Sequence, residues 1–141
     1  MKKIGFIGLL ILTSISYSCN DDNKNEVVDK NINVSVFFLK ENSFTENPDI
    51  GSNIYIYYGY DSMDFFGSIY KGDGKFIKND KEYIPDQSDI VNNNGMNTIQ
   101  PKYLEEMFTV VVVSNYYKDR IAMHTYSGKE YPINCKIINN P

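Results

Sequence analysis

The run at residues 108–114 (FTVVVVS) constrains the fold of this chain most, because it places four valines in succession. β-Branched residues favour strands over helices. Successive side chains of a strand point to opposite faces of a sheet, so a strand with valine at four positions in a row requires apolar cover on both faces. The sequence therefore predicts a central strand that is buried on both faces.

Alternating apolar residues predict further strands on either side of this run. They occur at residues 34–39, at residues 53–60 (NIYIYYGY), and at residues 121–126 and 130–138. In the second of these segments, Ile54, Ile56 and Tyr58 are expected on one face, and Tyr55 and Tyr57 on the other. The chain shows no internal repeat, no heptad pattern and no long amphipathic helix.

Turn signals divide the strands. Gly72-Asp73-Gly74 predicts a hairpin over residues 65–78, because glycine accepts the positive φ of a tight turn. Ser127-Gly128 predicts a second hairpin that joins residues 121–126 to 130–138. Residues 79–100 are rich in Asn and Asp and are expected to form a long irregular loop. Residues 101–107 (PKYLEEM) are expected to form about two helical turns, with proline in the first turn.

About seven strands joined by turns predict an all-β fold: an antiparallel immunoglobulin-like or transthyretin-like β-sandwich with one short helical turn. Residues 48–58 (PDIGSNIYIYY) resemble the turn and strand of transthyretin-like and carboxypeptidase-regulatory-like sandwiches, and residues 72–76 (GDGKF) resemble the turn that follows there. Residues 103–113 resemble a later strand of those domains, with EEM at 105–107 in place of their glycine-containing turn. The resemblance implies a fold and no particular activity, because such sandwiches host many functions.

The first eighteen residues have the order of a lipoprotein signal peptide. Lys2 and Lys3 precede an apolar run at residues 4–12, and small or polar residues then lead to Cys19. The apolar run is too short for a transmembrane helix, which needs about 20 residues. We expect cleavage before Cys19 and lipidation of that residue with acyl chains such as palmitate. Ser16 stands where lipoprotein signals usually have leucine, and ordinary signal-peptidase cleavage is the alternative.

Two acidic residues, Asp21 and Asp22, follow the expected lipidation site. They resemble the surface-export signal of Bacteroidetes lipoproteins, and solvated linker residues are the alternative interpretation. The resemblance implies a lipid anchor in the outer membrane and a domain exposed at the cell surface. The predicted organisation is a signal peptide at 1–18, a lipidated N-terminus and flexible acidic tether at 19–32, and a β-sandwich at 33–141.

The mature chain is acidic. After removal of residues 1–18, 12 basic and 18 acidic residues remain, which gives a net charge of −6. Such a chain lacks the basic surface of a nucleic-acid-binding protein, so nucleic acid is not expected as a partner. Membrane attachment is expected to depend on the acyl chains alone.

Catalytic residues are scarce. His124 is the only histidine, and Cys135 is the only cysteine besides Cys19. Cys135 alternates in step with Ile133 and Ile137, so it is expected on an apolar face as an inert buried thiol. His124 is expected on the more polar face of its own strand.

The sequence also lacks the signatures of nucleophile elbows, zinc-protease helices, phosphate-binding loops and dinucleotide-binding loops. Asp61, Asp64 and Asp73 are weighed as calcium ligands and are expected to be turn residues. No catalytic residue, metal or cofactor is therefore expected.

Tyrosines are the most conspicuous candidate binding residues. Four of them lie within residues 55–60, and two more lie at 116–117. An exposed tyrosine row can anchor a protein partner or stack on sugar rings. The alternative is that one face of the strand is core and the other is a cross-strand aromatic ladder. The candidate binding surface comprises Tyr55, Tyr57, Tyr60 and Tyr116.

Together these features predict a non-catalytic, lipid-anchored cell-envelope protein that acts as a binding module for a protein or glycan partner. The alternative is a structural or accessory subunit of a larger cell-surface assembly.

Overall fold

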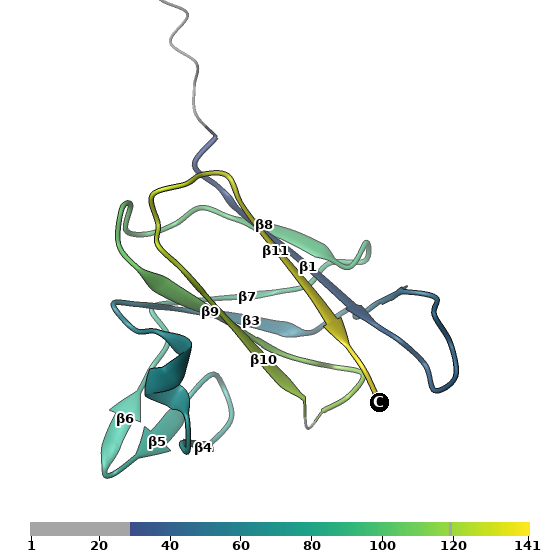
Figure 1. The fold of residues 1–141 in the computed structure, drawn as a ribbon, viewed down its shortest axis with the longest axis horizontal. Coiled ribbons are helices and arrows are strands. Elements are labelled where there is room, and N and C mark those ends of the chain that lie inside the picture. Colours follow the sequence, from purple (N-terminus) through teal and green to yellow (C-terminus); the bar gives the residue numbers. More distant parts are fainter. Residues whose placement is uncertain (1–28, 119) are drawn as a thin grey trace, which may run out of the picture.

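The computed structural model describes residues 29–118 and 120–141 (Figure 1). Over these residues the chain forms eleven strands and one short 3-10 helix, which confirms the predicted all-β sandwich. Cys19 and the predicted signal peptide lie outside the described residues. Within the described part, no helix is long and apolar enough to cross a membrane.

One layer of the sandwich, sheet B, is a four-stranded antiparallel sheet in the order β10-β9-β3-β7. These strands span Ile121–Tyr126 (β10), Phe108–Val113 (β9), Asn53–Tyr58 (β3) and Gln87–Ile90 (β7). β9 lies between β10 and β3, and all six of its residues are buried. The predicted central strand with two buried faces is therefore confirmed.

The other layer, sheet A, is built around β1 (Ile32–Phe38). β11 (Ile133–Asn139) pairs in parallel with one edge of β1. β2 (Asn47–Pro48) and β8 (Met96–Ile99) pair antiparallel with the two ends of its other edge. Because β1 and β11 are parallel, both run from the N-terminal end of the sandwich to its opposite end (Figure 1).

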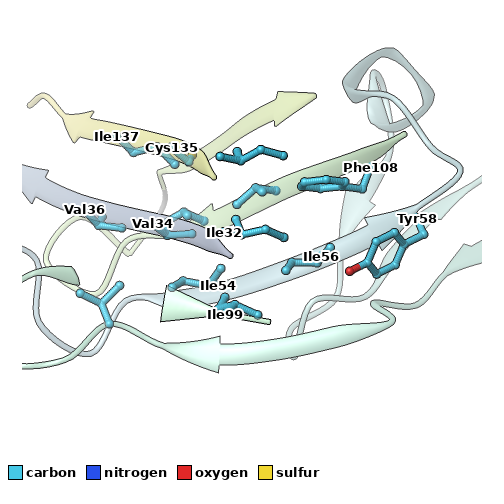
Figure 2. Packing of buried hydrophobic residues seen from close by; sticks show 14 residues of the cluster. Ile32, Val34, Val36, Ile54, Ile56, Tyr58, Ile99, Phe108, Cys135 and Ile137 are labelled. Atoms are coloured by element: carbon cyan, nitrogen blue, oxygen red, sulfur yellow. The ribbon is translucent and has the colours of Figure 1, made fainter. Parts of the chain in front are cut away.

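The main core lies between the two sheets, where alternate residues of each strand meet (Figure 2). β1 and β11 show strict alternation of buried and more exposed residues. Cys135 is buried here beside Ile133 and Ile137, which confirms its predicted position on an apolar face. The buried residues of this core are Ile32, Val34, Val36, Ile54, Ile56, Tyr58, Val91, Ile99, Phe108, Val110, Val112, Ile133, Cys135 and Ile137.

A second core lies on the outer face of sheet B, under a small three-stranded antiparallel sheet, sheet C. Sheet C consists of β4 (Ile69–Tyr70), β5 (Phe76–Lys78) and β6 (Lys81–Tyr83), and it is preceded by the 3-10 helix η1 (Ser62–Phe65) (Figure 1). The buried residues of the second core are Tyr55, Tyr57, Phe65, Phe76, Tyr83, Val111 and Val113. This cover explains why β3 and β9 are apolar on both faces.

Three local predictions are wrong. Residues 79–100 are no long loop, because they contain β6, β7 and β8. Asn79 and Asp80 both adopt positive φ, the geometry of a two-residue hairpin turn between β5 and β6. Residues 101–107 are not helical, because Glu105 adopts a φ of +65° and donates its N–H to the Gly128 carbonyl. The helical turn lies instead at η1.

The third error is the predicted hairpin over residues 121–138. β10 pairs with β9 in sheet B, whereas β11 pairs with β1 in sheet A. β10 is partly buried on both faces, with Ile121 against the second core and Ala122 against the main core, so it extends the doubly covered sheet. The predicted hairpin over residues 65–78 is confirmed in its outer part, where β4 and β5 pair, while η1 occupies its beginning.

Candidate binding surface

The predicted row of exposed tyrosines does not exist, and this part of the candidate surface is wrong. Tyr55 is 6% exposed and Tyr57 is fully buried. The Tyr57 hydroxyl donates a hydrogen bond to the Gly74 carbonyl in the turn of sheet C. Burial raises the pKa of both phenols. The alternative interpretation holds: one face of β3 belongs to the main core, and the other belongs to an aromatic cluster.

Tyr60 lies at the margin of that cluster. Its ring centroid is 5.3 Å from the Tyr83 ring and 6.2 Å from the Phe65 ring, and the Lys81 ammonium lies 4.8 Å from its centre. Tyr60 follows the end of β3 that pairs with Phe108, whereas Tyr116 follows the opposite end of β9. The two tyrosines are therefore separated by the length of sheet B and form no common surface.

Tyr116 is the one predicted binding residue that the structure leaves well exposed, at 49%. Its ring stacks on Phe38 at the end of β1, with a centroid separation of 3.7 Å and an interplanar angle of 10°. Tyr117 meets both rings edge-on, and its hydroxyl donates to the Leu39 carbonyl over 2.7 Å. These three rings hold the β9–β10 connection against the end of β1.

Asp49 holds the same region in place through hydrogen bonds, and sequence analysis missed it. Its carboxylate is 1% exposed and accepts hydrogen bonds from the Ser114 hydroxyl, from the Asn139 amide over 3.2 Å and from the Tyr116 backbone N–H over 3.0 Å. The Ser114 oxygen in turn accepts the Tyr117 N–H over 2.8 Å. One carboxylate thus joins the β2–β3 turn, the β9–β10 connection and the end of β11.

Two shallow hollows lie beside this network. One, of about 550 Å³, is lined by Tyr116, Tyr117, Lys118, Arg120 and Pro141. The other, of about 400 Å³, is lined by residues 39–44 together with Asn140 and Pro141. Because Pro141 borders both, the two hollows are adjacent. We call residues 39–44, 116–118, 120 and 140–141 the distal surface, since it lies at the end of the sandwich opposite the start of β1 (Figure 1).

Phe44 is the most prominent residue of the distal surface. It lies in the β1–β2 connection, and its side chain is 99% exposed, more than any other large apolar side chain among the described residues. Isolated apolar side chains on a surface are common. Phe44, however, lines a hollow together with Leu39, which directly follows the stacked Phe38 in the chain. This grouping marks a candidate contact site.

The residues weighed for catalysis and metal binding have structural positions. Burial raises the pKa of the Cys135 thiol, while His124 is exposed on the edge strand β10. Asp61 and Asp64 form the capping box of η1, in which each side chain accepts a backbone N–H. Asp73 is an exposed turn residue with a φ of +48°. Over residues 29–118 and 120–141, no group of three or more His, Cys, Asp and Glu side chains is placed to hold a metal ion.

Comparisons with known proteins identify no family. No protein-family model matches the chain, and a search of curated proteins returns no match. The transthyretin-like resemblance therefore stays a prediction.

Proposed function

We propose that this chain is a non-catalytic, lipid-anchored binding module of the outer membrane, which presents its distal surface to a protein partner at the cell surface. The observation that carries the proposal is the position of this surface relative to the expected anchor. β1 starts at Ile32, near the expected tether, and ends at Phe38, beneath Tyr116. Its seven residues span about 20 Å, so a tether that joins the domain at the start of β1 leaves the distal surface, at the other end, free for a partner.

The residue types of the distal surface favour a protein partner over a glycan. Aromatic residues and arginine dominate the energetics of protein interfaces, and this surface has Phe44, Tyr116 and Arg120. Burying a fully exposed phenylalanine in a partner contributes about 1.5–3 kcal/mol.

The absence of catalysis is part of the proposal. Cys135, the one described nucleophilic thiol, is buried in the main core, and the raised pKa of its thiol lowers its reactivity. His124 is exposed in β10. A Cys-His catalytic pair requires hydrogen-bond contact between the two side chains, and their different environments argue against one.

A matched pair of phenylalanine variants tests the proposal. We expect Phe44→Ser to abolish cross-linking of the full-length lipoprotein to its partner on intact cells. Phe66→Ser is the control, because Phe66 is also well exposed, at 75%, but follows η1 beside sheet C. Full capture by Phe44→Ser together with loss in Phe66→Ser would place the contact on the η1 face and contradict the proposal.

A further inference from the structure

The distal surface differs in charge from the rest of the domain. Residues 33–141 carry ten basic and fourteen acidic side chains. The described charged residues that line the two hollows are Lys40, Lys118 and Arg120 against Glu41, and all four are exposed. Asp119 lies between the two cations in the sequence, outside the described residues. With Asp119 counted from the sequence, these segments carry three basic and two acidic side chains, on a domain that is acidic overall.

Lys118 and Arg120 have no carboxylate partner within the described residues. The ion pairs of that part of the chain join Lys75 to Glu82 and Lys136 to Glu46. The backbone of Arg120 is nevertheless fixed, because its N–H donates to the Tyr117 carbonyl over 2.8 Å and its carbonyl accepts the Ser114 N–H over 3.0 Å. From this fixed backbone the exposed Arg120 guanidinium can bind a carboxylate through two parallel N–H donors.

The form of the surface indicates the kind of carboxylate ligand. The hollow with the two cations and the hollow lined by Leu39 and Phe44 are neighbours, because Pro141 lines both. A single acidic sugar would occupy the first hollow alone. An extended peptide crosses both, because its successive side chains occur at intervals of about 3.3 Å.

We propose that the distal surface recognises an extended acidic peptide segment of the partner protein. Lys118 and Arg120 bind its carboxylates, and the hollow beside Leu39 and Phe44 takes one of its apolar side chains. This inference rests on the proposed function and specifies the chemistry of the partner.

Fluorescence anisotropy with the full-length lipoprotein in detergent micelles tests this chemistry. The probes are a labelled octapeptide of alternating Glu and Leu and its counterpart with Gln in place of Glu. We expect the Glu peptide to bind at least tenfold more tightly than the Gln peptide. The double variant Lys118→Gln, Arg120→Gln should lose that difference. Lys71→Gln, Lys129→Gln is the control, because it removes the same charge from exposed lysines elsewhere and should bind like the wild type.

Three results would overturn the inference. Equal binding of the Glu and Gln peptides would show that carboxylates are not recognised, and equal losses in both double variants would show nonspecific attraction. Arg120-dependent binding of oligogalacturonate without binding of the Glu peptide would assign the surface to an acidic glycan. If Phe44→Ser abolishes partner capture while the peptides do not differ, this inference fails alone. If Phe44→Ser has no effect on capture, the proposed function fails as well.

Discussion

Replacement of Asp49 by alanine is expected to destabilise the fold more than its place in a turn suggests. The substitution removes the common acceptor of three hydrogen bonds, donated by Ser114, Asn139 and the Tyr116 backbone. Hydrogen bonds to a charged group contribute about 1.5–3 kcal/mol each. Three of them give an upper range of about 4.5–9 kcal/mol. Water that enters beside the distal surface can hydrogen-bond to the freed donors and offsets part of this loss. We therefore expect Asp49→Ala to lower the free energy of unfolding by about 3–5 kcal/mol.

Urea unfolding followed by circular dichroism measures this loss. For small proteins the slope against urea reports the surface exposed on unfolding, so it should stay constant while the midpoint falls. Glu130→Ala is the control, because it removes an exposed carboxylate that forms no ion pair within the described residues. A loss below about 1 kcal/mol for Asp49→Ala would refute the reasoning, because the contribution of one ordinary hydrogen bond would then account for the whole effect.

Two further predictions concern the cysteines. Cys19→Ser should abolish labelling with radioactive palmitate and move the protein from the membrane to the soluble fraction. If the wild type takes up no palmitate and the variant stays in the membrane fraction, the expected anchor is contradicted. Cys135 should react slowly with a polar disulfide reagent in the native protein and rapidly in urea, since its side chain is buried. Its raised pKa favours the neutral thiol in the folded state, so the thiol's contribution to stability is complete below its ordinary pKa and is lost as the pH rises above it. Rapid labelling of native Cys135 at neutral pH would show that β11 presents its other face to the core.

The parts of the fold that could be predicted are those with a strong local pattern. The valines of β9 and the alternation around Cys135 identify both the strands and their buried faces, because side-chain period alone determines them. The residue types of the turns predicted their structure only in part. Asn79 and Asp80 suggested a loop by composition, whereas their positive φ values form a tight turn between two short strands.

The tyrosines of β3 show why the site was harder to predict than the fold. Alternation places Tyr55 and Tyr57 on one face of the strand but does not say whether that face is covered. The cover comes from Phe65, Phe76 and Tyr83, which lie in η1, β5 and β6, elements of three or four residues that are too short to show a clear period. Tyrosine suits both a buried cluster and an exposed contact site, so its residue type did not decide between them.

Asp49 was missed for a related reason. Its partners lie 65, 67 and 90 residues away in the sequence, so no local pattern distinguishes it from the other aspartates in turns. The chain does offer one weak signal, which is that Asp49 stands between a proline and a strand with two buried faces. Only the arrangement of both sheets shows that this carboxylate holds the distal surface.

The two-sided burial of sheet B also limits where a binding site can lie. Sheet A covers one of its faces, and η1 with sheet C covers the other. The outer face of sheet A is mostly polar, and its aromatic side chain Phe37 lies under the Lys136 ammonium, which pairs with Glu46 over 2.7 Å. Both broad faces of sheet B are thus covered, and one end of the domain receives the expected tether. These constraints favour the opposite end, where Asp49 orders three connections around exposed aromatic and basic side chains.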